Sequence, residues 1–432
     1  MSDPADARPT IFALSSGALP AAIAVIRISG SGAGPALERL SGKLPPPRRA
    51  VSAILRNPSG DIIDHALVLW LPGPATATGE DLTELHVHGG KAVVAAVIAE
   101  LGAISGLRLA EAGEFTRRAF TNGRLDLDQI EGLADLLAAE TDTQRRQAIR
   151  LAEGGLGRLV DNWRDRLLDA AARVEAAIEF AEDEDDVPQI DPAALTRIAT
   201  LADEMRHALA QPPAERLRDG FRIVVAGPTN AGKSSLINVL AGREVAIASP
   251  IAGTTRDIIE APVSIGDFPC VLIDSAGLRN SAGQIERIGV ARARDAILAA
   301  DLILWLGDIE ECPDPDRSLV VAAKADLKKR HARAGEIATS VVTGQGIQDL
   351  RAAITGRLKR LLPPPDQIAL NARHRDEIRA TVTELEAAPL QAEPLLIAEH
   401  LRLARVALDR VAGRAGLEEM LDALFGRFCI GK

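Results

Sequence analysis

The stretch Gly227-Pro228-Thr229-Asn230-Ala231-Gly232-Lys233-Ser234 fits the phosphate-loop pattern G-x-x-x-x-G-K-[ST]. Before it, residues 221–226 (FRIVVA) form an apolar run typical of a buried strand, and after it residues 235–240 (SLINVL) predict an apolar helix. Glycines let backbone N–H groups approach a polyphosphate, and a helix N-terminus adds partial positive charge. Strand, loop and helix in this order predict an α/β nucleotide-binding domain rather than a chance glycine-rich turn.

Two side chains of this loop have roles that follow from their chemistry. Lys233 would reach the β- and γ-phosphates, and the hydroxyl of Ser234 would bind Mg²⁺. The residues expected to contact the nucleotide here are Asn230, Ala231, Gly232, Lys233, Ser234 and Ser235.

Two of three later segments concern the phosphates and the metal. Residues 253–257 (GTTRD) lie in a polar loop, where Thr255 would complete the magnesium shell and sense the γ-phosphate. An apolar strand at residues 270–273 leads into Asp274, Ser275, Ala276 and Gly277. That order places a carboxylate near Mg²⁺ and a glycine amide near the γ-phosphate.

The third segment concerns the base. Lys324 and Asp326 follow an apolar strand at residues 319–322, at the position where GTPases carry Asn-Lys-x-Asp. Together the three segments indicate a GTP-binding switch domain.

Motifs outside the nucleotide site resemble the MnmE (TrmE) family of bacterial tRNA uridine-modification GTPases. They are Thr78-Gly79-Glu80-Asp81, His88-Gly89-Gly90, residues 113–120 (GEFTRRAF), residues 122–127 (NGRLDL) and the terminus Phe428-Cys429-Ile430-Gly431-Lys432. They cover nearly the whole chain in the right order. The resemblance implies a multidomain α+β and α/β protein with a folate-binding-like N-terminal domain, a discontinuous helical bundle and an inserted Ras-like P-loop GTPase domain.

We therefore expect four segments. Residues 1–118 would form the N-terminal formyl-tetrahydrofolate-binding-like domain, 119–216 the first part of the helical domain, 217–362 the GTPase domain, and 363–432 the second helical part with its terminal Cys-Ile-Gly-Lys. Within the first segment, strands are expected near residues 51–55, 62–71 and 82–87 and a helix near 91–101. From Asp128 the spacing predicts two long helices separated by Gly154-Gly155, then a helix over 192–210 and three more after residue 363.

The resemblance implies a folate site in the N-terminal domain. Arg27, Glu84 and Arg124 would surround the pterin and its tail, with Lys432 reaching in from the terminus. Position 124 is often Lys in the family, so the charge is kept while the geometry differs. Without the resemblance, Glu84 reads as an outward carboxylate on an alternating strand.

Cys429 has three interpretations. The resemblance places it beside the folate and the tRNA base, with a catalytic role. Alternatively it is an inert buried thiol, or part of a prenylation box that Gly431 and Lys432 make unconvincing.

The resemblance also implies how water is positioned for hydrolysis. Leu278 stands where Ras-type GTPases carry a glutamine. Glu286 matches the family glutamate that orients the water, and Asn230 matches an asparagine that binds K⁺. The loop expected to contact nucleotide and K⁺ comprises Ser249, Pro250, Ile251, Ala252, Gly253 and Thr254, with Ser249, Ile251 and Thr254 as K⁺ ligands. The cation would stabilise transition-state charge when two GTPase domains face each other.

Two positions depart from the base-recognition pattern. Ala323 stands where the asparagine is expected, and Val341 follows Ser340 where Ser-Ala is usual. Asp326 remains, and its carboxylate pairs with donors that guanine has and adenine lacks. We expect Ser340 and Val341 to contact the base, and GTP to be preferred but bound more weakly than in typical members.

Composition limits the function classes. A net charge of −10 argues against indiscriminate nucleic-acid binding, so RNA needs a local basic patch. Candidate side chains for it are Arg117, Arg118, Arg124, Arg145, Arg146 and Arg150, although the sequence slightly favours a solvated helix face balanced by neighbouring acids. Three scattered cysteines argue against a disulfide framework or zinc site. With no signal-peptide pattern and no apolar run near about 18 residues, we expect a cytoplasmic protein without a membrane segment.

The sequence thus predicts a homodimeric, potassium-stimulated GTPase that uses Mg²⁺ and works with an FAD-dependent MnmG-like partner. The pair would add a (carboxymethyl)aminomethyl group to the wobble uridine of certain tRNAs, with the carbon taken from a tetrahydrofolate derivative. The alternative is a regulatory or assembly GTPase switch without modification chemistry, which would leave the folate residues without a ligand. A third possibility is a paralogue whose altered base loop has shifted nucleotide choice.

Overall fold

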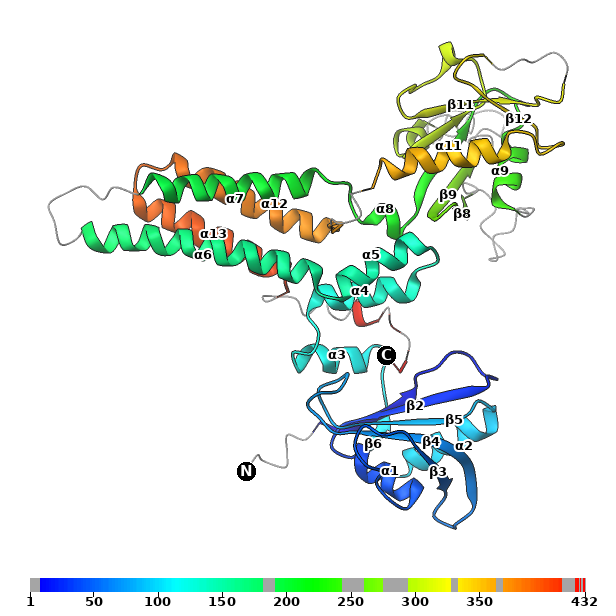
Figure 1. Cartoon of the computed structure of the whole chain (residues 1–432), viewed down its shortest axis with the longest axis vertical. Helices are drawn as coiled ribbons and strands as arrows, with labels where there is room; N and C mark the ends of the chain where they lie inside the picture. The colour runs from blue at the N-terminus through cyan, green and yellow to red at the C-terminus, as the bar shows by residue number, and fades with distance from the viewer. Residues whose placement is uncertain are drawn as a thin grey trace, which may run out of the picture. The chain divides into compact units, whose positions relative to one another are not determined.

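The structure, a computed structural model, describes residues 8–181, 191–242, 260–274, 294–327, 333–362, 368–413, 424–426, 428 and 430–431. The chain divides into two compact units (Figure 1). The first comprises residues 1–134 and 412–432, and the second comprises residues 135–411. No helix within the described ranges is long and apolar enough to cross a membrane.

The first unit is built on a six-stranded mixed sheet with the order β3-β4-β5-β2-β1-β6. Its strands are β1 (Thr10–Leu14), β2 (Ile23–Ser29), β3 (Val51–Arg56), β4 (Ile62–Leu71), β5 (Leu82–His88) and β6 (Leu107–Leu109). Neighbours pair antiparallel except β1 and β6, which run parallel. The predicted strands near 51–55, 62–71 and 82–87 are confirmed.

Helices α1 (Ala33–Ser41) and α2 (Lys91–Gly102) contribute to the core of this unit, and α2 confirms the helix predicted near 91–101. Every second residue of β2 and β5 is buried in that core, which includes Ile26, Ile28, Leu37, Leu85 and Val97. The alternation sends the side chains between them to the opposite face of the sheet.

A second core of the first unit is formed by residues near position 130 together with residues near the C-terminus. Helix α3 (Glu114–Thr121) is followed by α4 (Leu127–Ala138), and the buried residues of α4 pack with the C-terminal segment. This cluster contains Leu127, Ile130, Ala134, Leu424, Phe425 and Phe428.

The second unit contains helices from two separate parts of the chain. They are α5 (Asp142–Ala152), α6 (Gly155–Ala181), α7 (Pro192–Ala210), α12 (Ala372–Ala387), η3 (Ala388–Leu390) and α13 (Pro394–Val411). Helices α6, α7, α12 and α13 pack side by side (Figure 1). The helix predicted over 192–210 is confirmed, and α12 and α13 confirm two of the three helices predicted after residue 363, near 373–387 and 394–413. The third, near 417–426, lies largely outside the described residues.

The prediction of one long helix before Gly154-Gly155 is wrong. The chain forms α4 and α5 instead, because Thr141 adopts an extended conformation and caps a new helix. Its side chain accepts a hydrogen bond from the backbone of Gln144, whose own side chain accepts from the Thr141 N–H. This capping box satisfies amides that would otherwise have no partner at a helix start.

Between α7 and α12 the chain forms a second six-stranded sheet, with the order β12-β11-β10-β7-β9-β8. Its strands are β7 (Phe221–Ala226), β8 (Glu260–Ile265), β9 (Phe268–Asp274), β10 (Leu302–Trp305), β11 (Ser318–Ala323) and β12 (Ile337–Thr339). The same part of the chain also contains α8 (Glu215–Arg218), α9 (Lys233–Ala241), η2 (Ile309–Glu311) and α11 (Ile347–Lys359).

All neighbouring strands of this sheet are parallel except β8, which is antiparallel to β9. Buried clusters cover both faces, one including Leu236, Val321 and Ile354 and the other including Val224 and Ile303. Because the parallel strands end at one edge, the loops that follow them converge there, as in other open α/β sheets that bind ligands.

Candidate nucleotide-binding site

The phosphate loop connects the end of β7 to the start of α9. Gly227 and Gly232 have φ angles of 144° and 102°, which glycine adopts without strain. A Cβ at Gly227 would lie 3.0 Å from the carbonyl carbon of Leu306, so the loop also approaches β10 closely. The N-cap of α9 is Gly232, which has no side chain to cap the helix. The N-terminus of a helix is a favourable place for an anion.

Two side chains at the start of α9 point to different partners. Lys233 is buried, and its Nζ donates hydrogen bonds to the carbonyl oxygens of Gly227 (3.0 Å) and Pro228 (2.7 Å). Ser234 donates from Oγ to Oδ2 of Asp274, at 2.6 Å. The hydroxyl from α9 and the carboxylate from the end of β9 therefore meet, and two such hard oxygen donors suit Mg²⁺.

The loop after β11 lies against the phosphate loop. The Lys324 Nζ donates to the Asn230 carbonyl at 2.7 Å, and both residues have positive φ angles. Behind them, Oγ of the fully buried Ser340 donates to Oδ1 of Asp326 at 2.6 Å. The Ser340 N–H donates to the Gln345 carbonyl at 2.9 Å, so this hydroxyl and backbone hold Asp326 in place.

Ser340 was among the residues expected to contact the base, but its bond to Asp326 was not predicted. Thr339, which is buried beside Ala323 on the neighbouring strand, was not among the expected residues. A hydroxyl residue at the end of a short buried strand was the only available signal, and it is a weak one.

In the first unit, the structure brings Arg27 and Glu84 together. The two residues lie opposite each other on β2 and β5, and Arg27 donates from Nη2 and Nε to Glu84 Oε1 at 2.8 and 3.1 Å. Nε2 of His86 lies 3.3 Å from the other oxygen. Burial alone would raise the pKa of Glu84, but Arg27 and His86 lower it below its ordinary value. Glu84 is thus a half-buried, ion-paired carboxylate rather than an unpartnered one.

Arg124 has a different hydrogen-bond partner, since its Nε donates to the Thr76 carbonyl at 3.1 Å. Thr78, two residues further along, is bonded to Ser29 of β2, which follows Arg27 by two residues. Among the described residues, Arg27 and Glu84 are the predicted folate residues that contact each other directly.

The C-terminal residues are anchored to the strand next to Arg27. Ile430 forms a β-bridge with Ala112, and Ser15 Oγ donates to the Gly431 carbonyl at 2.9 Å. Gly431 has a φ of 99°, and a Cβ there would lie 2.2 Å from the Leu14 carbonyl oxygen, so only glycine fits. Leu14 is the last residue of β1, and Ser15 follows it. The residue before Leu14, Ala13, pairs with Arg27 of β2.

The Thr-Gly-Glu-Asp and Gly-Glu-Phe-Thr-Arg-Arg motifs contribute to one buried ion-pair network. Arg118 is 4% exposed and donates to Glu80 Oε2 (2.9 Å), Glu114 Oε1 (3.1 Å) and the Pro9 carbonyl (2.7 Å). Arg108 also donates to Glu114. Burial would raise the pKa of Glu114, but the hydrogen bonds from Arg108, the Glu111 amide and Arg118 lower it to about 2. Arg118 is therefore committed to the fold and is not available to RNA.

Three of the other arginines considered for RNA binding contact groups on their own unit. Arg145 and Arg146 both pair with Asp142 on α5, at 2.6 Å. The guanidinium of Arg117 lies 5.0 Å from the centre of the Phe425 ring. Arg145 and Arg146 thus share a single carboxylate on an exposed face of α5.

Several predicted residues lie outside the described residues. They are Ser249, Pro250, Ile251, Ala252, Gly253, Thr254, Thr255, Ser275, Ala276, Gly277, Glu286, Cys429 and Lys432.

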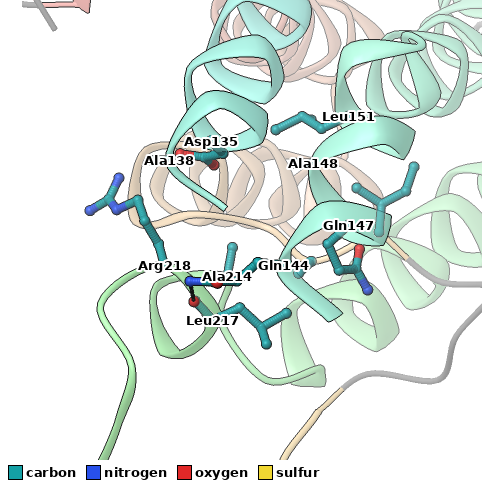
Figure 2. Close-up of a pocket in the computed structure, with 11 residues that line it drawn as sticks. Asp135, Ala138, Gln144, Gln147, Ala148, Leu151, Ala214, Leu217 and Arg218 are labelled. Carbon is teal, nitrogen blue, oxygen red and sulfur yellow. Dashed lines mark hydrogen bonds between the residues drawn. The ribbon is translucent and has the colours of Figure 1, made fainter. Parts of the chain in front are cut away.

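A pocket of the second unit lies where the chain passes from the helices to the second sheet and back (Figure 2). Ala214 N–H donates to the Leu370 carbonyl at 3.0 Å, and Nε2 of Gln144 donates to the Leu217 carbonyl at 2.9 Å. These bonds tie α5 to α8 and the start of α8 to the returning chain. The lining residues are Asp135, Ala138, Gln144, Gln147, Ala148, Leu151, Ala214, Leu217, Arg218, Ile368 and Ala369.

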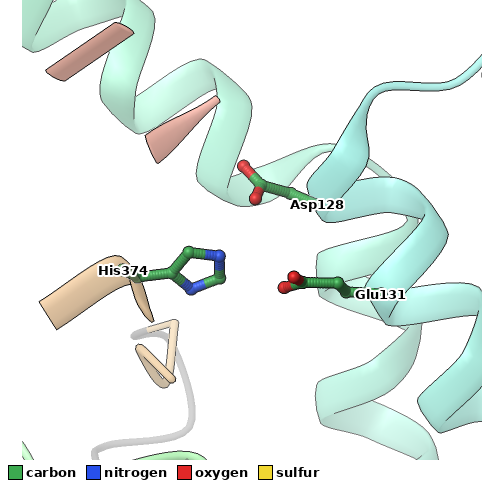
Figure 3. Close-up of side chains that lie close together, drawn as sticks. All are labelled: Asp128, Glu131 and His374. Carbon is green, nitrogen blue, oxygen red and sulfur yellow. The ribbon is translucent and has the colours of Figure 1, made fainter. Parts of the chain in front are cut away.

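Figure 3 draws Asp128 and Glu131 on α4 and His374 on α12. The two carboxylates belong to the first unit and the histidine to the second, where its Nδ1 accepts from the Asn371 N–H and completes a capping box. We assign no metal site to these three residues.

Comparisons with known proteins agree with this geometry. Residues 10–124 match the family model described as GTP-binding protein TrmE N-terminus, and residues 127–429 match that described as MnmE helical domain. The chain is 53% identical over 432 residues to the tRNA modification GTPase MnmE of Rhizorhabdus wittichii, covering 99% of this chain and 98% of that protein. It is 53% identical over 425 residues to the protein of the same name from Erythrobacter litoralis, covering 98% and 100%. The chain belongs to the MnmE family of tRNA modification GTPases.

Proposed function

We propose that this tRNA modification GTPase is a cytoplasmic homodimer, that K⁺ stimulates its GTP hydrolysis, and that it works with an FAD-dependent, MnmG-like partner. The pair would add a (carboxymethyl)aminomethyl group to the wobble uridine of certain tRNAs, taking the carbon from a tetrahydrofolate derivative. The observation that carries this proposal is the ion pair of Arg27 and Glu84 on the first sheet. Ile430 and Gly431, near the C-terminus, are held next to the same sheet by their contacts with Ala112 and Ser15.

The chemistry of these side chains suits a folate. The lowered pKa keeps Glu84 ionised at neutral pH, so its carboxylate would accept hydrogen bonds from the N–H groups of a pterin. The guanidinium groups of Arg27 and Arg124 would bind carboxylates of the tail. Lys432 would add a further cation, and Cys429 would lie near the reacting carbon. A bound tetrahydrofolate derivative would supply the one-carbon unit.

Apolar side chains on the same face of the sheet support the homodimer. The strand register places Leu67 opposite His86, Ile23 opposite His88 and Ile54 opposite His65, which puts all three on the face that carries Glu84. Their exposed fractions are 42% for Leu67, 60% for Ile23 and 37% for Ile54. A second copy of this chain would remove that apolar surface from water.

At the nucleotide, Lys233 would move from its loop carbonyls to the phosphates, and Ser234 with Thr255 would bind Mg²⁺ next to Asp274. Asn230, which is exposed on the loop, would bind K⁺ together with Ser249, Ile251 and Thr254. These cations would neutralise developing negative charge. Glu286 would orient the attacking water, and Asp326, held by Ser340, would select guanine.

The first experiment measures GTP hydrolysis by the purified full chain in K⁺ and in Na⁺ at equal ionic strength. Strong stimulation by K⁺ that Asn230→Ala removes is the expected result. Equal rates in the two salts would contradict the potassium mechanism.

The second experiment measures binding of 5-formyltetrahydrofolate by calorimetry. Glu84→Gln and Arg27→Ala should weaken binding by at least about tenfold each, since each removes a charged hydrogen-bond partner. Glu38→Gln changes an exposed carboxylate of α1 and serves as the control. If the unaltered chain binds no folate, the regulatory or assembly switch becomes the better explanation.

A further inference from the structure

Ala323 and Thr339 are directly opposite each other at the ends of the parallel strands β11 and β12. Both are buried, with exposed fractions of 6% and 1%. Val321 and Ala323 belong to the core cluster on the side of α9 and α11, and Ile337 packs against the same cluster. Because side chains alternate along a strand, Thr339 points to the same face as Ile337 and hence as Ala323.

The Thr339 hydroxyl has no hydrogen-bond partner among the residues that the structure describes. The neighbouring polar groups do have partners, since Ser340 donates to Asp326 and Lys324 donates to Asn230. A buried hydroxyl without a partner is unfavourable and uncommon in native proteins. The methyl group of Ala323, which faces it across the strands, can neither donate nor accept a hydrogen bond.

We infer that the pair of residues 323 and 339 sets how firmly the base-recognition loop is held, and thereby how tightly this GTPase binds guanine nucleotides. A side-chain amide at position 323 would bond the Thr339 hydroxyl and join β11 to β12 immediately before Lys324 and Asp326. With alanine there, the loop keeps the Lys324 and Ser340 contacts but lacks this cross-link. The chain therefore binds GTP weakly and releases GDP quickly.

A double-mutant cycle on the full chain tests this inference, with Ala323→Asn, Thr339→Val and both together. The readouts are the Kd for GTP, the release rate of a fluorescent GDP, and the midpoint of thermal unfolding without nucleotide. Ala323→Asn should tighten GTP binding and slow GDP release by about fivefold, the effect of about one net hydrogen bond. Thr339→Val alone should leave the Kd within about twofold and should not lower the midpoint, because it removes a hydroxyl that has no partner among the described residues.

In the double variant, the gain from Ala323→Asn should disappear. Thr355→Val on α11 is the matched control, because that hydroxyl donates to the Arg351 carbonyl at 2.8 Å and its loss should lower the midpoint. A gain that persists without the Thr339 hydroxyl would overturn the inference. So would a clear loss of midpoint or affinity in Thr339→Val alone, since it would reveal a partner for the hydroxyl.

If Ala323→Asn fails to fold, Thr339→Val and the smaller change Ala323→Ser decide the matter. Ala323→Ser should tighten binding when Thr339 is present and should have no effect when it is combined with Thr339→Val, and any other result contradicts the inference. These measurements use only GTP and GDP, so they are independent of whether the chain binds folate.

Discussion

The two six-stranded sheets of this protein place their candidate sites differently. In the second sheet, the polar side chains come after the strands, at the edge where parallel strands end, and both faces are covered by apolar clusters. In the first sheet, Arg27 and Glu84 lie within strands β2 and β5, on a face whose apolar side chains are partly exposed.

In the second sheet, the residues expected to bind ligands are therefore different from those that stabilise the fold. In the first unit, the charged residues are expected to do both. The loops at the end of the second sheet can change without disturbing its apolar core. The first unit holds its charged groups by ion pairs between residues far apart in sequence, such as Arg27 with Glu84 on the sheet and Arg118 of α3 with Glu80. We therefore expect substitutions in the first unit to affect folding, and substitutions at the phosphate loop to affect activity.

Arg118→Ala should have the largest effect. The change leaves Glu80 and Glu114 without their buried cation and should lower the free energy of unfolding of the first unit by about 3–5 kcal/mol. Hydrogen exchange of the amides in β2 and β5 measures this loss. Arg145→Ala is the control, because its ion pair with Asp142 is exposed to solvent and should contribute little to stability. Similar losses in the two variants would remove the distinction between buried and surface pairs.

Acid should weaken the first unit through Glu114. Its pKa falls from 4.5 to about 2 on folding, so its contribution is complete above about pH 4.5 and is lost as the pH falls toward 2. The shift corresponds to at most about 3 kcal/mol, because solvent screens part of the interaction at this half-buried side chain. Urea titrations at pH 6 and pH 2.5 should show that Glu114→Gln costs less stability at the lower pH. An equal cost at both would mean that Glu114 is not held ionised by its arginines.

Lys233→Ala should change activity without changing the fold. The rate of GTP hydrolysis should fall by at least about 100-fold, since the lysine is expected to neutralise phosphate charge. The thermal midpoint should stay close to that of Lys359→Ala, which alters an exposed lysine of α11 and leaves hydrolysis unchanged. A large fall in the midpoint of Lys233→Ala would show that its bonds to Gly227 and Pro228 stabilise the fold, and would contradict the contrast between the sheets.

Ser340→Ala should have the smallest effect. The variant loses the hydroxyl that orients Asp326, so the Kd for GTP should rise about fivefold while the Kd for ATP stays the same. Calorimetry with both nucleotides measures the change in selectivity. Equal weakening for GTP and ATP would mean that Asp326 does not select the base.

Much of the fold could be predicted from local sequence. The strands near 51–55, 62–71 and 82–87 followed from apolar runs and turns, and the nucleotide domain followed from a contiguous strand, loop and helix. The break between α4 and α5 was missed, although Thr141 with Gln144 three residues later fits the S/T-x-x-E/Q capping box. The boundaries expected at residues 118, 216 and 362 stay predictions.

The sequence by itself determined the phosphate loop, because its glycines, lysine and serine act through a backbone conformation that eight adjacent residues encode. It also determined that alanine occupies position 323. Only the tertiary structure decided what these residues contact. The register of β2 with β5 brings Arg27 to Glu84, 57 residues apart, and the packing of α3 makes Arg118 a buried ion-pair partner rather than an RNA ligand. The pairing of β11 with β12 places Ala323 beside the Thr339 hydroxyl. Such contacts depend on how distant segments pack, and no local pattern in the chain specifies them.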